Sequence, residues 1–277
     1  MERRLLLFAF ALLGLTFLLI CLRVEVRKEL RVRYITPSSP SSILRVSCEA
    51  VPAVVYTRVP CLRGLPSGVR KRLFVDLLLP EVLIQNFRIM KLRRRLLKLK
   101  GEMERGNVSE EDMRWLKAMC RRFKASSVEE LLYKVDVIPP GLAIAQAAIE
   151  TGWGTSRFFC EANNLFGEWD FSKTKEGAVK AKGGRAYLKR FKSVLDSVES
   201  YFYNLNAGWA YEGFRLARMR DKSSLTLAKH LERYSVLGRE YIDRLERLIE
   251  LEGLDRYDRC KIDGSYIERS FSVSFCR

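Results

Sequence analysis

A single glutamate follows a run of small apolar residues in the segment AQAAIETGWGTS, which spans residues 145–156. If this run forms a buried helix, Glu150 lies near its C-terminal end, where the carboxyl group has lost much of its water. Loss of water penalises the ionised form and the negative end of the helix dipole penalises it further, so the pKa of Glu150 should rise. A carboxyl group that keeps its proton near neutral pH can serve as the general acid in glycosidic bond cleavage. The alternative is a helix-end glutamate that forms an ion pair with a neighbouring Arg or Lys.

The helix that would carry this glutamate is marked at both ends. Pro139-Pro140 suits the first turn of a helix, where proline costs no hydrogen bond. The segment GLAIAQAAIE that follows offers no solvated face, so the helix should be buried on most sides. After it, Gly152 and Gly154 allow a tight turn into a cleft, and Trp153 between them can supply an apolar wall.

Helical periodicity predicts further helices on both sides of this segment. Apolar residues recur at helical spacing between Val69 and Leu97, and Pro80 is expected to kink or split that helix. The same periodicity returns over residues 194–205 and 241–249. Two capping-box spacings predict further helix starts, Ser109 with Asp112 and Ser127 with Glu130.

A short β-hairpin is predicted between the glutamate segment and the later helices. The alternating stretches AVKAK and AYLKRF stand on either side of Gly183 and Gly184. Alternation of apolar and polar residues around a glycine pair is typical of two short antiparallel strands. We therefore expect a mainly helical (α+β) body with one small hairpin.

The N-terminus begins with an uncharged apolar run of membrane-span character from Leu5 to Leu22. Its length lies between that of a long signal-peptide core and that of a short span. No small-residue cleavage motif closes the run, so residues 1–22 are interpreted as an uncleaved anchor, with a cleaved signal as the alternative. Basic residues on both sides leave the orientation open. The proline-rich stretch 23–65 predicts an extended linker, with short strand-like pieces around VVYTRV.

Charge and cysteine content narrow the classes of function. The net charge is +17, and residues 1–134 hold 27 Lys and Arg against 13 Asp and Glu. Such an excess indicates either attraction to a polyanion or solvated faces of long helices. No nucleic-acid motif is present, and nucleic-acid binding is not expected. With one histidine and no CxxC pair, neither a metal centre nor a cofactor is predicted. Among the seven cysteines, Cys48–Cys61 and Cys260–Cys276 are conceivable local disulfides, and reduced thiols are the alternative.

The stretch VDVIPPGLAIAQAAIETGWGTSRFFCEANNLFGEW resembles the catalytic core of the Bax-type glucosaminidases. These belong with the peptidoglycan-cleaving N-acetylglucosaminidases of glycoside hydrolase family 73, in the lysozyme-like superfamily. The family signature A-x-A-A-x-E-[ST]-x-W-G-x-S, followed by N-N-L-F-G, is intact in this chain. Later segments YFYNLN and YSVLGREYIDRL also match, so the resemblance covers roughly residues 66–252. It implies a mainly helical, lysozyme-like catalytic domain with a small β-hairpin.

The resemblance also implies roles for single residues. Glu150 matches the general acid/base of the family, and Tyr234 matches a tyrosine that lies in the cleft near the reacting sugar. A tyrosine that only packs between helices is the alternative for Tyr234. The implied substrate-binding residues are Trp153, Asn163, Asn164, Phe166 and Trp169.

These five residues would act in different ways. Asn163 and Asn164 would shape the turn beside the cleft, although asparagine is also an ordinary loop residue. Phe166 and Trp169 would line the core or the cleft wall, with Trp169 the better candidate for stacking on a sugar ring.

A second catalytic carboxylate is less well defined. Many family members place a second glutamate on the β-hairpin, and two carboxylates would serve inverting or retaining hydrolysis according to their separation. Here Glu176 is the candidate, with Glu168 and Asp170 shortly before it. A substrate-assisted route, in which the acetamido group of the sugar replaces a protein nucleophile, would need no second carboxylate.

Together these features predict five segments and one activity. The activity is hydrolysis of peptidoglycan strands after N-acetylglucosamine, with a lytic transglycosylase or a non-catalytic wall-binding protein as alternatives. The anchor would hold the catalytic domain on the periplasmic or extracytoplasmic side of the bacterial inner membrane. The segments are an anchor (1–22), a linker (23–65), a helical extension (66–134), a catalytic domain (135–252) and a tail (253–277).

Overall fold

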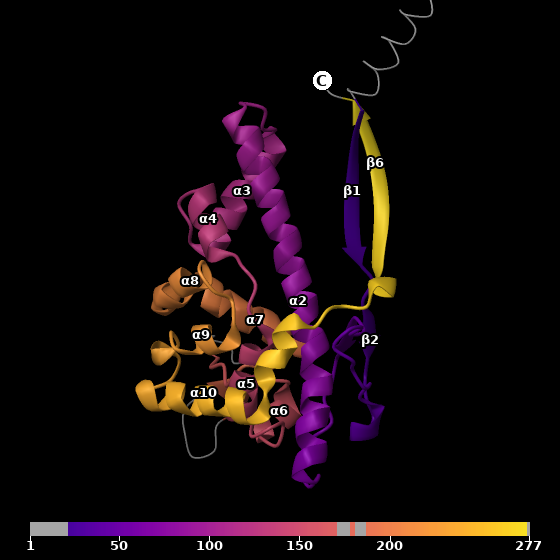
Figure 1. Ribbon diagram of the computed structural model, residues 1–277, viewed down its shortest axis with the longest axis vertical. Helices are drawn as coiled ribbons and strands as arrows, with labels where there is room; N and C mark the ends of the chain where they lie inside the picture. The colour runs from indigo at the N-terminus through magenta and orange to yellow at the C-terminus, as the bar shows by residue number, and fades with distance from the viewer. Residues whose placement is uncertain (1–21, 171–177, 181–186, 276–277) are drawn as a thin grey trace, which may run out of the picture. The chain divides into compact units, whose positions relative to one another are not determined.

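The computed structural model describes residues 22–170, 178–180 and 187–275, which form mainly helices with three two-stranded sheets (Figure 1). The chain divides into two compact units, the larger comprising residues 32–263 and the smaller comprising the segments before and after it. The predicted mainly helical body is therefore confirmed.

The smaller unit is built on one antiparallel ladder. Strand β1 (Leu22–Leu30) pairs with β6 (Ile267–Phe275), and Arg31 forms an ion pair with Glu268 at 3.2 Å. Residues 270–275, SFSVSF, are thus part of a strand in the predicted tail. The first residues of the predicted linker also form a strand, β1. Apart from Leu22, the predicted membrane anchor lies outside the described residues. Among the residues that are described, no helix combines the length and the apolar character that a membrane span requires.

Helix α2 (Ser67–Glu104) is the longest element of the larger unit, at 38 residues. Its first half is buried from Leu73 to Gln85 and packs against α5 (Pro140–Thr151) and α7 (Val194–Ala207). The helix runs through Pro80 without a break, so the predicted split is wrong, and the predicted kink stays a prediction. Packing on the core supplies most of the stability of such a helix, which tolerates one lost backbone hydrogen bond.

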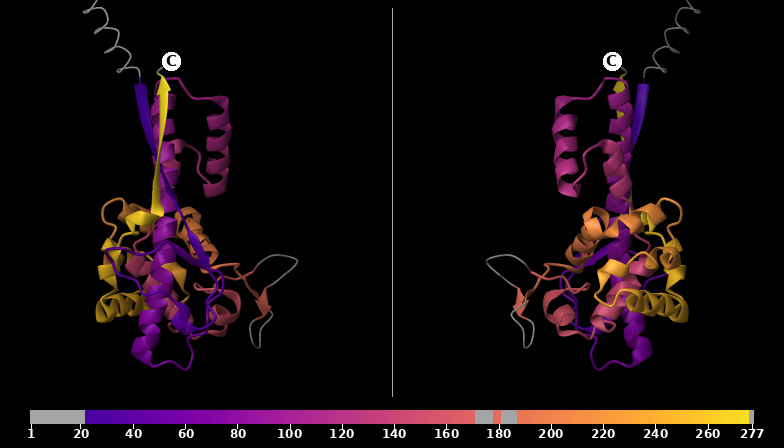
Figure 2. Two further views of the ribbon diagram at one scale, coloured as in Figure 1. Left: turned by 90° about the vertical axis from the view of Figure 1, so that its right-hand side faces the viewer. Right: turned by 90° about the vertical axis from the view of Figure 1, so that its left-hand side faces the viewer.

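The second half of α2 carries a helical hairpin formed by α3 (Glu110–Phe123) and α4 (Val128–Lys134), which lie beside it in Figure 1 and Figure 2. Both predicted helix starts are confirmed. The Ser109 hydroxyl accepts from the Asp112 N–H at 3.1 Å, and the Ser127 hydroxyl accepts from the Glu130 N–H at 3.2 Å. Several basic residues here form ion pairs, for example Arg95 with Asp112 at 3.1 Å, as expected for solvated faces of long helices.

Residues 33–62 are part of the packed unit and not an extended linker. Strand β2 (Arg33–Ile35) pairs in parallel with β3 (Val54–Tyr56), which lies in the predicted strand-like piece and is fully buried. The Tyr56 N–H donates to Glu81 Oε1 of α2 at 2.8 Å. The prolines restrict this stretch, but its apolar residues are buried against α2 and α7, which outweighs the tendency to stay extended in solvent.

The remaining elements complete the two units. The predicted β-hairpin is present as β4 (Val179–Lys180) and β5 (Tyr187–Leu188), an antiparallel pair at the edge of the larger unit (Figure 2). The predicted helix after Val194 is α7. The other α-helices are α6 (Arg157–Ala162), α8 (Glu212–Arg218), α9 (Ser224–Ala228) and α10 (Arg239–Glu252). The 3-10 helices are η1 (Pro40–Ser42), η2 (Trp209–Tyr211), η3 (Glu232–Tyr234), η4 (Leu254–Arg259) and η5 (Gly264–Tyr266).

The disulfides join distant parts of the chain. Cys48 is bonded to Cys260 and Cys61 to Cys160, across 212 and 99 residues of sequence. The local pairings considered from the sequence, Cys48–Cys61 and Cys260–Cys276, are therefore wrong. Spacing along the sequence favours near neighbours, whereas the fold brings the start of the larger unit against its end and against α6.

Candidate active site

Glu150 lies in the last turn of α5, the helix that the sequence predicts. Nearly every other residue of this helix is buried, whereas Glu150 is half-buried and keeps access to solvent. Burial raises the pKa of Glu150, and a hydrogen bond from Tyr241 acts in the opposite direction. The predicted direction of the shift is confirmed, and loss of water is its main cause.

A chain of buried hydrogen bonds leads to this carboxyl group. The Tyr201 hydroxyl donates to Gln146 Oε1 at 2.7 Å, and Gln146 Nε2 donates to the Tyr241 hydroxyl at 3.0 Å. Because the Tyr241 oxygen accepts from Gln146, its own proton is directed to Glu150. Gln146 and Glu150 are four residues apart on α5, so they lie on one face of the helix.

These hydrogen bonds, made by Gln146, Tyr201 and Tyr241, were not predicted from the sequence. Burial raises the pKa of both Tyr201 and Tyr241, so both phenols stay protonated and act as donors. A polar Gln146 in an otherwise apolar helix, one turn before the glutamate, is the signal that could have revealed it. A fully buried amide needs partners, and here tyrosines from α7 and α10 supply them.

Tyr234 is brought to the same place. Its ring stacks on that of Tyr241, with centroids 5.5 Å apart and planes at 18°. Its hydroxyl donates to the Phe166 carbonyl oxygen at 3.5 Å. Burial raises the pKa of Tyr234, and the neighbouring tyrosines and Glu150 add to the shift. The structure therefore places Tyr234 beside the glutamate, as the family resemblance implies.

Asn163 and Asn164 fix the loop that follows α6. Asn163 has a left-handed backbone with φ of 52°, and its side chain donates to the carbonyl oxygens of Thr57 and Phe191 at 3.1 and 3.0 Å. Asn164 donates to the Glu168 carbonyl at 2.9 Å and accepts from the Glu168 N–H at 3.0 Å. Both amides bind backbone groups of the protein itself, so they shape the turn, as predicted.

Gly167, the last residue of the NNLFG segment, lies close to Glu150. A Cβ on this residue would lie 3.4 Å from Glu150 Oε2, and its φ of 67° also favours glycine. Phe166 is buried and stacks on Tyr201, with ring centroids 4.0 Å apart. A side chain at position 167 would contact the carboxyl group and would be strained by the positive φ. Gly167 is the glycine that ends the N-N-L-F-G signature, and its closeness to Glu150 was not predicted.

The Trp153 side chain packs on residues of helix α2. Its backbone φ of 58° turns the indole toward Phe74, in an edge-on contact at 5.7 Å, and Lys71 Nζ lies 5.5 Å from the ring centroid. The indole lines a cavity of about 440 Å³ of which Glu150 is not a lining residue. A wall from Trp153 beside the glutamate stays a prediction, and Tyr241 is an aromatic residue that is hydrogen-bonded to Glu150. Trp169 is 49% exposed, and its backbone bridges Leu188 of β5.

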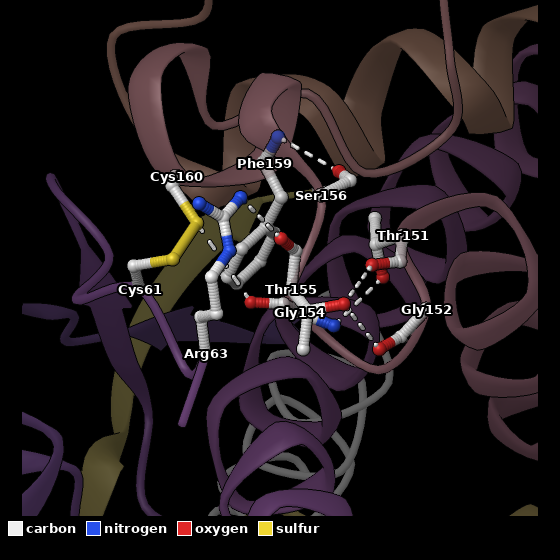
Figure 3. The surroundings of a disulfide bond; sticks show 9 residues. All are labelled: Cys61, Arg63, Thr151, Gly152, Gly154, Thr155, Ser156, Phe159 and Cys160. Atoms are coloured by element: carbon white, nitrogen blue, oxygen red, sulfur yellow. Dashed lines mark hydrogen bonds between the residues drawn. A yellow bond between two sulfur atoms is a disulfide. The ribbon is translucent and has the colours of Figure 1, made fainter. Parts of the chain in front are cut away.

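The turn after α5 is held by the disulfide between Cys61 and Cys160 (Figure 3). Arg63, next to this disulfide, donates to the Thr155 carbonyl oxygen at 2.9 Å. Gly154 has no room for a side chain, because a Cβ would lie 2.9 to 3.1 Å from Leu62, Phe159 and Phe74. These contacts fix the backbone that follows the glutamate.

A second carboxylate beside Glu150 is not established. Glu176 lies outside the described residues. Glu168 Oε2 accepts from Lys189 Nζ at 3.1 Å and from the Ser200 hydroxyl at 2.6 Å, so this side chain is bound toward α7. The Asp170 N–H donates to the Tyr187 carbonyl oxygen at 2.7 Å. Within the described ranges, no three His, Cys, Asp or Glu side chains are grouped so that they could hold a metal ion.

Sequence comparison matches the central part of the chain to known proteins. The glucosaminidase family model, described as mannosyl-glycoprotein endo-beta-N-acetylglucosaminidase, matches residues 125–254. Protein bax of Escherichia coli K12 is 31% identical over 198 residues, which cover 66% of this chain and 70% of that protein. This chain belongs to the Bax-type glucosaminidase family. It is accordingly a glycoside hydrolase.

More distant similarity extends to two other proteins. The exo-glucosaminidase LytG of Bacillus subtilis is 24% identical over 161 residues, which cover 52% of this chain and 55% of LytG. The catalytic domain of the autolysin Auto from Listeria monocytogenes overlaps with a TM-score of 0.36 at 20% identity, over 58% of this chain and 97% of that domain. An overlap of this quality carries no argument about the fold.

Proposed function

We propose that this Bax-type protein hydrolyses the glycan strand of peptidoglycan after N-acetylglucosamine, in a lysozyme-like domain with Glu150 as general acid/base. The observation that carries the proposal is the position of Glu150. Its carboxyl group ends a buried helix, burial raises its pKa, and it remains half-buried, so a substrate can reach it. The resemblance to peptidoglycan-cleaving glucosaminidases supplies the substrate class.

The first step is proton transfer from Glu150 to the glycosidic oxygen. The bond between that oxygen and the anomeric carbon breaks, its electron pair stays on the oxygen, and positive charge develops on the sugar. The carboxylate that remains is stabilised by the Tyr241 hydroxyl, because a donor favours the charged form. Gln146 keeps that hydroxyl oriented toward Glu150.

The second step adds water to the anomeric carbon. The Glu150 carboxylate can take the proton of the attacking water and so return to its starting state. The nucleophile that bonds to the anomeric carbon before the water arrives would be the acetamido group of the substrate or a carboxylate of the hairpin. Glu176 is the candidate for this carboxylate. Tyr234 would hold the substrate or the water by its hydroxyl group.

We place the catalytic unit outside the cytoplasm, tethered by the apolar N-terminal segment. Two disulfides, Cys48–Cys260 and Cys61–Cys160, support this placement, because such bonds form and persist in oxidising compartments. A tether at residues 1–22 with the N-terminus in the cytoplasm would leave the rest of the chain on the wall side.

The test is digestion of purified peptidoglycan by the protein and by Glu150→Gln. We expect wild type to release reducing N-acetylglucosamine ends, identified by mass spectrometry, and the variant to be slower by about 10²–10⁴-fold. Ends that carry 1,6-anhydro-muramic acid would indicate a lytic transglycosylase instead. Equal rates for the two proteins would refute the role of Glu150.

A further inference from the structure

Trp209 is the most exposed tryptophan for which the structure describes the side chain, at 79% exposure. It lies in η2 and lines a cavity of about 310 Å³, near the lower end of the size of small-molecule pockets. The charged or titratable residues that line this cavity come from α8, η3 and the segment between α9 and η3. They are Glu212, Lys229, His230, Glu232 and Arg233.

The lining has the chemistry that a neutral sugar requires. The indole offers a flat apolar surface for the C–H face of a pyranose ring, and Arg233 lies 5.4 Å from the indole centroid and braces it. Glu212 and Glu232 can accept from hydroxyl groups, whereas Lys229 and Arg233 can donate to them. Two acidic and two basic groups balance one another, so the cavity favours an uncharged ligand over an anion.

This cavity is connected to the Glu150 site by a row of aromatic rings. Tyr211 ends η2 and Tyr234 ends η3, and their ring centroids are 6.3 Å apart. Tyr234 in turn stacks on Tyr241, at 5.5 Å, and Tyr241 is hydrogen-bonded to Glu150. Neither Glu150 nor any of these three tyrosines lines the cavity. The cavity is therefore separate from the carboxyl group, with the tyrosine rings between them.

We propose that Trp209 and its cavity form a remote subsite for an N-acetylglucosamine unit of the strand, away from the bond that Glu150 cleaves. This inference rests on the proposed function. A strand long enough to reach both places binds more tightly than a short one. Trp209 thereby favours cleavage within long strands over cleavage of short fragments.

The test measures binding of glycan strands of increasing length, prepared from peptidoglycan, to the Glu150→Gln protein by titration calorimetry. We expect affinity to rise with length, and Glu150→Gln/Trp209→Ala to lose about tenfold on long strands with little change on short ones. Trp209→Phe in the same background should keep part of the gain, because it retains an aromatic ring. The matched control is Leu251→Ala, which truncates an equally exposed apolar side chain, at 77%, that does not line the cavity.

The outcomes separate this inference from the proposed function. If wild type cleaves peptidoglycan but the Trp209→Ala and Leu251→Ala proteins bind long strands alike, the subsite is refuted and the proposed function stands. Equal weakening on short and long strands would refute the remote position of the subsite. If wild type cleaves no peptidoglycan and the Glu150→Gln protein binds no strand, both proposals fail.

Discussion

Two glutamates on helices of the larger unit, Glu150 on α5 and Glu81 on α2, have carboxyl groups whose pKa is raised by burial. Glu81 is fully buried, and its Oε1 accepts from the Tyr56 N–H of the β3 strand. Glu150 is half-buried and accepts a hydrogen bond from the Tyr241 hydroxyl. A raised pKa is common to both, so it does not identify a catalytic acid. Each carboxyl group accepts a hydrogen bond, so access to solvent is what distinguishes Glu150 from Glu81.

The largest difference between the two residues should be in catalysis. Glu150→Gln is expected to reduce turnover by about 10²–10⁴-fold, because it removes the proton that the leaving oxygen needs. Glu81→Gln should leave turnover near the wild-type value, since a neutral amide replaces a carboxyl group that is already protonated. Rates on purified peptidoglycan check both variants, and similar losses in the two would show that access is not the deciding property.

The second difference should be in stability. Glu81→Ala removes the acceptor of the Tyr56 N–H and leaves a cavity in the core, so we expect a loss of about 2–4 kcal/mol in the free energy of unfolding. Chemical denaturation measures this loss. Glu250→Ala, at an exposed position of α10, is the control and should change stability by less than about 0.5 kcal/mol. A Glu81→Ala protein as stable as the control would contradict a structural role for Glu81.

The third test concerns the hydrogen bond from the Tyr241 hydroxyl to Glu150. Tyr241→Phe removes the donor that lowers the pKa of Glu150, so that pKa should rise further. Activity that needs a protonated acid is lost as the pH rises above the pKa, so the falling limb of the pH–rate profile should move to higher pH. We also expect turnover to drop by about tenfold, because one hydrogen bond to a charged group is worth about 1.5 kcal/mol. An unmoved limb would mean that Tyr241 does not tune the acid.

The smallest effect should be a pH dependence of stability at Glu81. Its pKa is raised in the folded state, so above the ordinary pKa of a glutamate the unfolded chain binds fewer protons than the folded protein. Stability from this group is complete at lower pH and is lost as the pH rises through its folded pKa. Glu81→Gln should flatten that decline in thermal unfolding measured between acid and neutral pH. The same decline in wild type and variant would assign it to other groups.

Local patterns predicted several helices, including the one that carries Glu150. Small apolar residues after Pro139-Pro140 define α5, and serine caps mark the starts of α3 and α4. These features depend on neighbours within one or two helical turns, which are visible in sequence. The glutamate was found for the same reason, since its position at the end of the helix is a local property.

Contacts between distant segments could not be predicted in this way. Gln146 and Tyr241 are 95 residues apart, and Tyr56 and Glu81 lie on different elements. The orientation of Trp153 depends on a left-handed backbone that its residue type does not favour, so its packing on Phe74 was not predicted. The disulfide pairing failed because it follows the tertiary fold and not the spacing of the cysteines.

The Cys48–Cys260 bond is accompanied by three backbone hydrogen bonds between the same two segments. The Val51 N–H donates to the Lys261 carbonyl, the Lys261 N–H to the Cys48 carbonyl and the Asp263 N–H to the Val51 carbonyl, at 2.8 to 3.0 Å. The larger unit is therefore closed into a covalent ring near the points where the chain enters and leaves it. A cut by a protease in a surface loop between Cys48 and Cys260 would leave both fragments joined, so it would not by itself release either of them.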